Sequence, residues 1–533
     1  MAFQLKSLRD TWVEVRMNKS VPPTSLQEAL DLVQKLREEM ARHEFQLEQV
    51  QKYLLSQHEL QQQLVPTWSP VQNCEKEDAS GTLTQKILKL DILDTKPQDT
   101  ASRLRATWLG KLYIHHLKQY AIARVAIKWI WRNGYPIYAN HIAAHITNRK
   151  AKRWYPLTKL STYVKENGLQ AHKLAEESPI DVSVPKVFPE SDKDYLGISN
   201  ERSIFPEIYV AAVNDGIVYG GTNLVMVKGE VVCHDLYDFD SDFTSEELHG
   251  RTLIDPKFGR IRWLQHDKQP VRIPVAAVFV DACASNYAHW LTEVMSRMAL
   301  FCADDRFKHI PIIINDGLHP NILESLQVVA GPEREIITLP VGRALHADEL
   351  YLTSVAGYVP FDRRTKKQNG HSHGIFSPPA FEHLRNVKQH VAGKFADIGW
   401  PDKIYLRRNS GARKVTNAIE IEKLLVANGF QVIEPEKLTF TQQIQLFNHA
   451  KQIIAPTGAS LANGIFCKPQ TKVAVLMGKH EDMIYRYWFN MLDPLQVRVT
   501  YVLGNIVKEK DLGIHGDFYV NPDDVRDLLE VWQ

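Results

Sequence analysis

Residues 403–466, KIYLRRNSGARKVTNAIEIEKLLVANGFQVIEPEKLTFTQQIQLFNHAKQIIAPTGASLANGIF, give the clearest indication of the fold in this chain of 533 residues. A short β-branched run ends before Arg407, and further strand patterns occur at residues 430–433 and 452–455, with helical patterns between them. These runs form two strand–helix units in succession. The alternation predicts an α/β fold with a parallel sheet of the doubly wound type.

Residues suited to a diphosphate follow these predicted strands. They comprise three arginines, two glutamates and a small-residue turn: Arg407, Arg408, Arg413, Glu434, Glu436, Thr457, Gly458, Ala459 and Ser460. In a doubly wound sheet, ligands bind beyond the carboxyl ends of the strands. Arginine binds phosphate through paired hydrogen bonds, and a free helix N-terminus attracts negative charge. The stretch therefore predicts a binding site for a diphosphate group.

The composition is that of a globular protein with several domains. Hydrophobic residues make up 44% of the chain and charged residues 24%, and the formal net charge is +2, which is ordinary for soluble proteins. An odd number of scattered cysteines indicates reduced thiols and a cytosolic setting. The N-terminus lacks the apolar core of a signal peptide, and no uncharged apolar run reaches the roughly 18–20 residues of a spanning helix. We therefore expect a cytoplasmic protein.

Residues 1–66 carry a heptad pattern. Ser25 and Glu28 form a capping-box pattern at its start, and Pro66 ends it. Apolar side chains recur every seven residues in two columns, which include Leu26, Val33, Met40, Leu47, Leu54, Ala29, Leu36, Val50 and Leu64. This pattern predicts a coiled-coil helix that joins copies of the chain into a homo-oligomer. The alternative is an amphipathic helix folded back on the same chain.

Between Asp99 and Glu166 the sequence has no acidic residue, although lysines and arginines alternate with tryptophans and tyrosines. We interpret residues 67–180 as a basic, aromatic-rich helical region, with a helical period at residues 112–131. Such a segment suits an anionic membrane surface, where each nearby Lys or Arg adds about 1 kcal/mol. Two alternatives are an anionic polymer and a helical hairpin whose aromatic side chains pack inside. Nucleic acid is not expected as a partner, because no nucleic-acid-binding motif accompanies the charge.

A further α/β region precedes the stretch quoted first. Residues 208–232 predict hairpins, and residues 275–301 predict a buried strand, a short turn and a helix. On that helix His289, Glu293 and Arg297 are spaced by four, so they share one face. A histidine with a carboxylate four residues later could act as an oriented general base. The alternative is a surface ladder of His, Glu and Arg without chemistry.

We expect no metal centre in this chain. His371 and His373 lie in a long loop, residues 361–379, and could ligate a metal, but no third ligand accompanies them. Asp-x-Asp spacings also occur at residues 238–240 and 240–242. They lie in an acidic loop after the predicted hairpins, so we interpret them as surface.

The two α/β segments together resemble the glycosyltransferase family 61 domain over about residues 208–478. That family includes bacterial capsular-polysaccharide enzymes, plant xylosyl- and arabinosyltransferases and animal N-acetylglucosaminyltransferases. Thr457 departs from the pattern, because the family usually has histidine at that position. The resemblance rests on the order and spacing of Asn286, Tyr287, His289, Trp290, Glu293, Arg297, Tyr405, Arg407, Arg408, Arg413, Asn417, Gly429, Phe430, Glu434, Glu436, Gln443, Phe447, Gly458, Ala459, Ser460, Asn463 and Phe466.

The resemblance implies a GT-B arrangement, in which two Rossmann-like domains face each other across a cleft. It also implies an inverting, metal-independent transfer from a nucleotide sugar, commonly a UDP-sugar, with no further cofactor. His289 would be the catalytic base and Glu293 its partner, and either Glu434 or Glu436 would accept the ribose hydroxyls. The substrate-binding residues would be Asn286, Arg297, Arg407, Arg408, Arg413, Glu434, Glu436, Thr457, Gly458, Ala459, Ser460 and Asn463.

Four regions are therefore expected: a coiled coil (1–66), the basic region (67–180), an acceptor domain (181–377) and a nucleotide-sugar-binding domain (378–533). The leading hypothesis is a transferase that builds a bacterial surface polysaccharide or glycan on a glycan or lipid-linked acceptor, at the inner face of the cell membrane. An alternative is a catalytically impaired, glycosyltransferase-like scaffold or binding subunit, which the coiled coil and Thr457 motivate. A third is a nucleic-acid-associated protein that acts through the basic region.

Overall fold

A computed structural model describes most of the chain after residue 152. The coiled coil predicted for residues 1–66 and the pair His371 and His373 lie outside the described residues, and the basic region is described only in part. The described residues are 67, 87–89, 107–117, 123, 126, 127, 129, 130, 134, 137, 153–197, 201–263, 270–360, 362, 363, 374–391, 399–480, 483, 485–507 and 515–533.

Residues 403–466 supply β20, β21 and β22 of a parallel sheet, which confirms that prediction. The strands lie in the order β21-β20-β22-β23-β24, and each is parallel to its neighbour. The order reverses between β20 and β22. In doubly wound sheets, ligands bind at such a switch point, beyond the carboxyl ends of the two strands. The bounds are β20 (Lys403–Leu406), β21 (Gln431–Ile433), β22 (Gln452–Pro456), β23 (Lys472–Lys479) and β24 (Arg498–Ile506).

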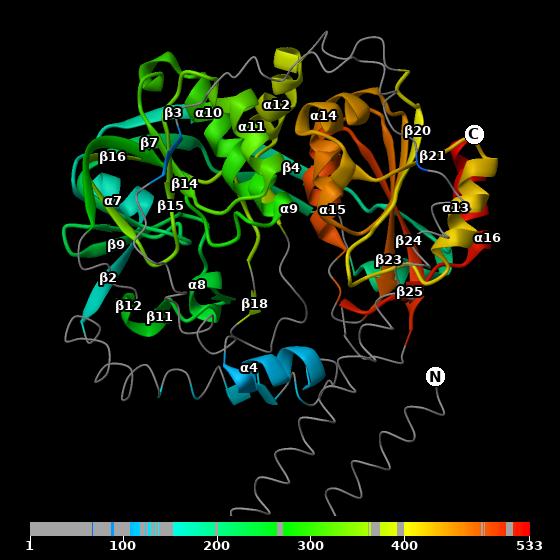
Figure 1. The fold of residues 1–533 in the computed structure, drawn as a ribbon, viewed down its shortest axis with the longest axis horizontal. Helices are drawn as coiled ribbons and strands as arrows, with labels where there is room; N and C mark the ends of the chain where they lie inside the picture. The colour runs from blue at the N-terminus through cyan, green and yellow to red at the C-terminus, as the bar shows by residue number, and fades with distance from the viewer. Residues whose placement is uncertain are drawn as a thin grey trace, which may run out of the picture. The chain divides into compact units, whose positions relative to one another are not determined.

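Helices connect these strands, and Figure 1 shows them in yellow, orange and red on the two faces of the sheet. Thr439 begins α14 with a capping box, because its hydroxyl accepts from the Gln442 amide while the Gln442 side chain accepts from the Thr439 amide. The helices are α13 (Ala418–Ala427), α14 (Phe440–His449), the 3₁₀-helix η10 (Ala459–Phe466), α15 (Arg486–Leu492) and α16 (Pro522–Trp532). Two outer strands complete the sheet, β5 (Lys186–Phe188) parallel to β24 and β25 (Phe518–Tyr519) antiparallel to it.

A twelve-stranded sheet forms from the preceding part of the chain. Its centre is parallel, with the order β15-β14-β13-β16, and the order reverses between β13 and β16. This sheet therefore has a switch point of its own. The predicted hairpins are confirmed as three antiparallel strands that continue the sheet beside β16. The bounds are β13 (Val271–Val278), β14 (Ile312–Asn315), β15 (Ile336–Leu339), β16 (Ala344–Thr353), β7 (Ile208–Tyr219), β8 (Val225–Val227) and β9 (Glu230–Cys233).

Strands from the basic region join this sheet. The prediction that residues 67–180 form a helical region is therefore wrong for these strands. β2 pairs with β9, β3 with β7, and β1 with β15. Their partners lie far along the chain, and such tertiary pairing outweighs a local helical pattern. The strands are β1 (Ile87–Lys89), β2 (Trp154–Lys159) and β3 (Ala171–Ala175), and β12 (Arg260–Trp263) and β11 (Thr252–Asp255) extend the sheet beyond β2. α4 (Trp108–Leu112) and the π-helix η1 (Tyr113–Leu117) are helical.

The acidic loop after the hairpins is not entirely at the surface, which corrects that interpretation for Asp242. This residue is only 2% exposed. β10 (Asp242–Phe243) pairs with β18 (Asp362–Arg363), and the Tyr358 hydroxyl donates to the Asp242 carboxylate at 3.1 Å. Among the described residues, no three His, Cys, Asp or Glu side chains are grouped so that they could hold a metal ion. None of the described helices combines the length and apolar character needed to cross a membrane.

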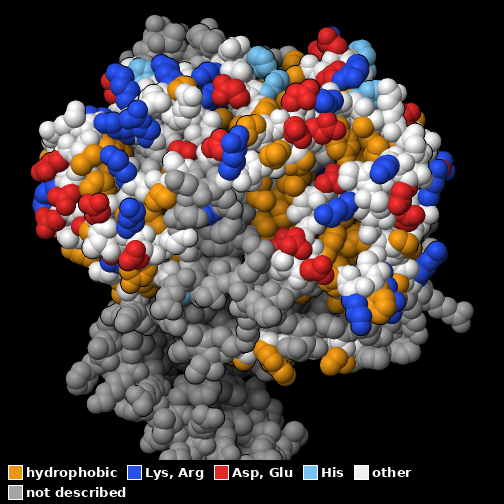
Figure 2. All heavy atoms as spheres, turned by 180° about the vertical axis from the view of Figure 1, so that it is seen from behind, with side chains coloured by type: hydrophobic (Ala, Val, Ile, Leu, Met, Phe, Trp, Pro, Cys, Tyr) orange, Lys and Arg blue, Asp and Glu red, His pale blue; other side chains and the backbone are white. Residues whose placement is uncertain are grey.

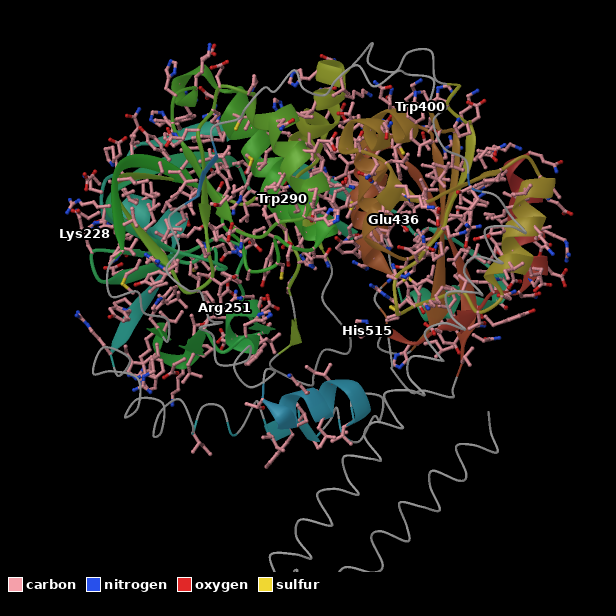
Figure 3. The ribbon with its side chains drawn as sticks, in the orientation of Figure 1. Lys228, Arg251, Trp290, Trp400, Glu436 and His515 are labelled. Atoms are coloured by element: carbon pink, nitrogen blue, oxygen red, sulfur yellow. The ribbon has the colours of Figure 1, made fainter. Side chains whose placement is uncertain are left out.

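The helix that follows β13 is irregular. It consists of α9 (Tyr287–His289), the π-helix η6 (Trp290–Met295) and α10 (Ser296–Ala303). Asn286 begins it, because its side chain accepts from the Ala288 amide at 3.0 Å. Trp290 anchors it, since the ring is fully buried and its Nε1 donates to Ser325 at 2.9 Å (Figure 3). Turns of π-helix are frequent at functional sites.

One hydrophobic core is shared by the helices of both sheets. It contains Trp290 and Phe301 from the first part of the chain and Phe440 and Phe466 from the second. α12 (Pro378–Asn386) packs against both α10 and η10. On the face shown in Figure 2, side chains of both charge signs are interspersed, and hydrophobic patches lie between them. Among the described residues, that face therefore offers no continuous basic surface.

Candidate active site

A histidine–carboxylate pair lies at the switch point of the twelve-stranded sheet, on the helix that follows β13. Nδ1 of His289 is hydrogen-bonded to Oε2 of Glu293, and Oε1 of Glu293 accepts from the Val359 amide at 2.8 Å. Both carboxylate oxygens of Glu293 are thus engaged. The bond at Nδ1 leaves Nε2 of His289 as the ring nitrogen without a partner among the described residues. The His289 side chain is 17% exposed and that of Glu293 10%.

The charge of Glu293 governs the protonation of His289. Burial by itself lowers the pKa of the imidazole, but the Glu293 carboxylate and its hydrogen bond raise the pKa above the ordinary value of 6.5, with a smaller contribution from Asp281. A carboxylate on Nδ1 also fixes the tautomer that exposes Nε2 as the proton acceptor. Such a pair can act as a general base whose orientation the carboxylate sets.

A small polar cavity of about 30 Å³ adjoins this pair. This volume exceeds the roughly 10–15 Å³ needed for one water molecule. Its lining residues include His289, Glu293, Asn223, Ser245, Glu246, Asp281, Cys283 and Tyr358. Asp281 lies three residues after the end of β13 and accepts from Asn223 Nδ2 at 3.0 Å. The position of Asp281 after a buried strand was the sequence signal for it, whereas Asn223 and Glu246 carried none.

Glu246 is a buried acid of this cavity that the sequence did not reveal. Its Oε1 accepts from the Thr222 hydroxyl at 3.0 Å, and its Oε2 has no hydrogen-bond partner among the described residues. Burial, and then the charge of Asp281, raises the pKa of Glu246 to about 7. The carboxyl group is therefore partly protonated near neutral pH.

Arg297 lies in the interior rather than on a surface ladder. Its guanidinium donates to the Thr353 carbonyl at 3.4 Å and lies 5.7 Å from the centre of the Phe279 ring. Burial lowers its pKa, while Asp281 and Glu293 act in the opposite direction. Because Glu293 and Arg297 are both buried, the alternative of a solvated His–Glu–Arg ladder is wrong.

Arg407, Arg408 and Arg413 follow β20, at the switch point between β20 and β22, and they have different surroundings. Arg407 is buried, and its Nε and Nη2 donate to the two oxygens of Glu422 at 2.9 and 2.7 Å. Such a two-pronged pair inside the protein holds β20 against α13. The guanidinium of Arg407 is thus occupied within the fold.

Arg408 and Arg413 lie close enough for the charge of Arg413 to act on Arg408, and the Asp517 carboxylate acts on Arg408 in the opposite direction. Nε of Arg408 donates to the Ala412 carbonyl at 2.9 Å, and Nε of Arg413 is buried with no hydrogen-bond partner among the described residues. Burial, and then the charge of Arg413, lowers the pKa of Arg408 to about 10. Burial also lowers the pKa of Arg413. In the described part of the chain neither arginine forms an ion pair, so an anion placed beside both would relieve their repulsion.

The guanidinium of Arg408 lies directly over the small-residue turn. A Cβ built on Gly458 would collide with Nη1 of Arg408. The end of β20 and the end of β22 therefore meet at these two residues. The neighbouring Thr457 is turned away, because its buried hydroxyl accepts from Trp488 Nε1 at 3.0 Å.

The two glutamates after β21 also differ. Glu434 is buried, accepts from Asn409 Nδ2 at 2.9 Å and is paired with Lys437. Glu436 is exposed and hydrogen-bonded to the same Asn409 side chain. Only Glu436 of the two has a carboxylate that a ligand can reach.

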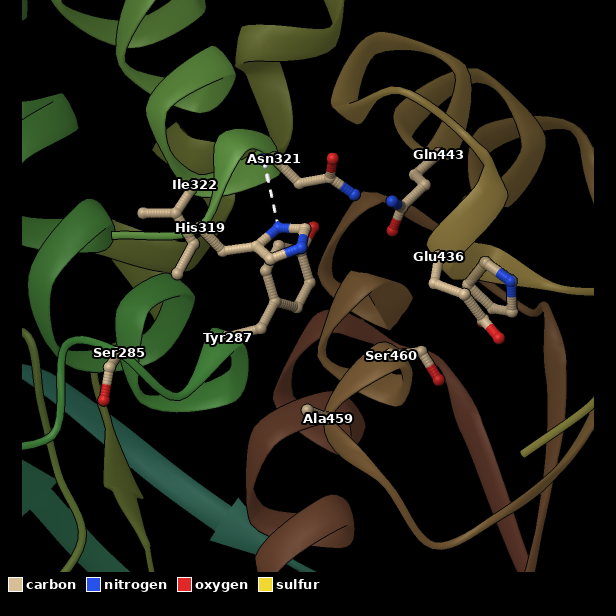
Figure 4. A pocket seen from close by; sticks show the side chains of 10 residues that line it. Ser285, Tyr287, His319, Asn321, Ile322, Glu436, Gln443, Ala459 and Ser460 are labelled. Carbon is tan, nitrogen blue, oxygen red and sulfur yellow. Dashed lines mark hydrogen bonds between the residues drawn. The ribbon is translucent and has the colours of Figure 1, made fainter. Parts of the chain in front are cut away.

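A larger cavity of about 310 Å³ is lined by residues from the helices and loops that follow the strands of both sheets. Tyr287, His319 and Asn321 face it from the first part of the chain, and Glu436 and Ser460 face it from the second (Figure 4). The remaining lining residues are Ser285, Ile322, Pro435, Gln443 and Ala459. Asn463 lies behind this wall, where it accepts from the Tyr287 hydroxyl at 2.7 Å.

The arrangement therefore has a histidine–glutamate pair at one switch point, Arg408 and Arg413 at the other, and a cavity lined by residues from both parts of the chain. Residues 287–474 match the family model described as Glycosyltransferase 61. That range contains His289, Glu293, the arginines and the small-residue turn. No curated protein sequence matches this chain at a significant level. The chain contains a glycosyltransferase 61 domain, and the protein is a glycosyltransferase.

Proposed function

We propose that the protein is an inverting, metal-independent glycosyltransferase of GT-B arrangement that uses a nucleotide sugar, in the first place a UDP-sugar. One observation carries this proposal. The His289–Glu293 pair and the Arg408–Arg413 pair each lie at the switch point of a sheet. A single displacement at an anomeric carbon needs a base for the acceptor hydroxyl and positive charge for the departing diphosphate. His289 supplies the first, and Arg408 with Arg413 supplies the second.

The reaction follows from these positions. Nε2 of His289 removes the proton of the acceptor hydroxyl while its oxygen forms a bond to the anomeric carbon. The bond between that carbon and the diphosphate oxygen breaks on the opposite face, and its electron pair leaves with the nucleoside diphosphate. Configuration is inverted because attack and departure occur on opposite faces. Glu293 stabilises the imidazolium that forms.

Arg408 and Arg413 stabilise the departing diphosphate in this account. Both guanidinium groups are partly desolvated, so their interaction with new negative charge is stronger than in water. The backbone of Gly458 and the start of η10, with Ala459 and Ser460, offer N–H groups on the same side. We assign Glu436 rather than Glu434 to the ribose hydroxyls, since its carboxylate is exposed beside the cavity.

The side chains of Asn286, Asn463 and Thr457 are all engaged in hydrogen bonds within the protein. Asn286 caps α9, Asn463 is hydrogen-bonded within the protein, and the Thr457 hydroxyl is bound to Trp488. Thr457 therefore takes no part in the proposed chemistry. This favours an active enzyme over a scaffold that only binds.

The acceptor is proposed to be a glycan or a lipid-linked glycan of a bacterial surface polysaccharide, at the inner face of the cell membrane. The supporting observation concerns the basic region, where Trp129 is 66%, Ile130 54% and Ile137 60% exposed. Exposed apolar side chains in a segment without acids suit an anionic lipid surface. The homo-oligomer through residues 1–66 stays a prediction.

A donor panel tests the proposed function. Purified protein is incubated with UDP-, GDP- and ADP-sugars, and release of the nucleotide is followed by mass spectrometry. We expect hydrolysis of at least one UDP-sugar, with water as the acceptor, and unchanged activity in EDTA. If no nucleotide sugar is consumed while UDP still binds, the scaffold alternative is correct.

A further inference from the structure

A series of hydrogen bonds joins α9, the helix that carries His289, to η10, which follows Gly458. The Tyr287 hydroxyl is 2.7 Å from Asn463 Oδ1, and Asn463 Nδ2 is 2.7 Å from Gln443 Oε1. Gln443 Nε2 in turn donates to the Leu438 carbonyl at 3.1 Å. Asn463 and Gln443 are both buried.

The direction of each bond in this series is fixed. Because Gln443 donates to a carbonyl through Nε2, its Oε1 can only accept from Asn463. Asn463 then donates through Nδ2 and offers Oδ1, so the Tyr287 hydroxyl must be a donor. Each group has a single role, and the series is satisfied in one arrangement only.

Tyr287 and Asn463, the first two residues of this series, lie next to the proposed chemistry. Tyr287 precedes His289 by two residues in α9, so any movement of Tyr287 also moves the base. Asn463 lies in η10, which begins directly after Gly458, the residue beneath Arg408. α9 and η10 also pack against each other.

We propose that Tyr287 is a positioning residue of the transfer reaction. Its hydrogen bond to Asn463 fixes the distance between Nε2 of His289 and the turn that carries the donor diphosphate. A displacement of reacting groups by about 1 Å can lower a rate on the order of 10²-fold. This inference rests on the proposed function, because it needs His289 as the base and the turn after β22 as the donor side.

The variant Tyr287→Phe tests the proposal, because it removes only the hydroxyl. We expect kcat for nucleotide release from the accepted UDP-sugar to fall about 10- to 100-fold. UDP affinity should stay within about twofold, and the acid limb of the pH profile should not move. The matched control is Tyr485→Phe, whose buried hydroxyl donates to the Gly478 carbonyl at 3.2 Å away from these residues, and kcat should be retained there.

The variant Asn463→Leu removes the same bond from the opposite side. We expect a similar loss of kcat, and the double variant should be no slower than the slower single variant. If Tyr287→Phe does not fold, Asn463→Leu carries the test alone. An unchanged kcat, or losses that multiply in the double variant, would overturn the proposal.

A raised KM with unchanged kcat in Tyr287→Phe would also overturn it, because Tyr287 would then bind the donor directly. These outcomes are distinct from failure of the proposed function. In that case the wild-type protein itself consumes no nucleotide sugar, or His289→Ala remains active.

Discussion

The Glu293 carboxylate accepts a hydrogen bond from the main-chain amide of Val359 at 2.8 Å. The helix after β13 is thereby tied to the segment that follows β16. This hydrogen bond restricts rotation of the Glu293 side chain, so the carboxylate oxygen that faces His289 is held in place. The carboxylate in turn fixes the tautomer of His289, four positions earlier on the same helix.

Replacing Glu293 by Gln should move the acid limb of the pH profile to lower pH. The carboxylate raises the pKa of His289, and transfer needs the neutral ring, so activity rises with pH through that pKa. Without the negative charge the ring loses its proton at lower pH. The measurement is kcat/KM for nucleotide release between pH 5 and 9.

The control for this shift is Glu382→Gln, an exposed carboxylate paired with Arg385 away from the site. Its profile should match that of the wild type. An acid limb that stays in place in Glu293→Gln would contradict the assignment of His289 as the titrating group.

Replacing Arg408 or Arg413 by Ala should weaken UDP binding about 10- to 100-fold, since hydrogen bonds to charged groups contribute about 1.5–3 kcal/mol. Isothermal titration calorimetry with UDP measures the effect. The uridine nucleoside should lose little affinity in the same variants, because it lacks the diphosphate. Arg526→Ala, an exposed arginine in α16, is the control. Equal UDP affinity in all three variants would rule out this diphosphate site.

The variant Glu422→Gln should destabilise the protein rather than its active site. It leaves the buried Arg407 without its two-pronged partner, and breaking such a pair costs about 3–5 kcal/mol. Urea denaturation should show this loss of unfolding free energy. Glu420→Gln, an exposed residue of the same helix, should change it by less than about 0.5 kcal/mol. A variant with wild-type stability and lost UDP binding would mean that Arg407 contacts the ligand after all.

Liposome flotation should show binding to anionic vesicles and none to neutral ones. Binding should be lost at 1 M salt, where the Debye length is about 3 Å. Trp129→Ser together with Ile130→Ser should weaken it, because both side chains are exposed in the basic region. Val531→Ser, exposed in α16, is the matched control. Equal flotation on neutral vesicles would contradict an electrostatic membrane site.

Much of this architecture follows from short-range sequence patterns. The strand–helix alternation of residues 403–466 gave the parallel sheet, and the spacing of four gave the pairing of His289 with Glu293. His289 and Glu293 are four residues apart on one helix, so their contact is readable from the sequence. Each strand and helix of residues 403–466 is likewise readable from its own local period.

The remaining features depend on contacts between distant segments. Three arginines near one strand end look alike in sequence, and only the approach of Glu422 from α13 removes Arg407 from the site. The bond between Tyr287 and Asn463 joins residues 176 positions apart. β2 and β3 became strands because β9 and β7 offered free edges, which no local pattern reports.

The variant His289→Ala tests whether His289 is the catalytic base. Removing a general base should lower nucleotide release from the accepted UDP-sugar on the order of 10²–10⁴-fold, whereas calorimetric affinity for UDP should match that of the wild type. Glu293→Gln should lose less. If His289→Ala retains most of its activity while Glu293→Gln is inactive, the carboxylate is the base and the account given for His289 is contradicted.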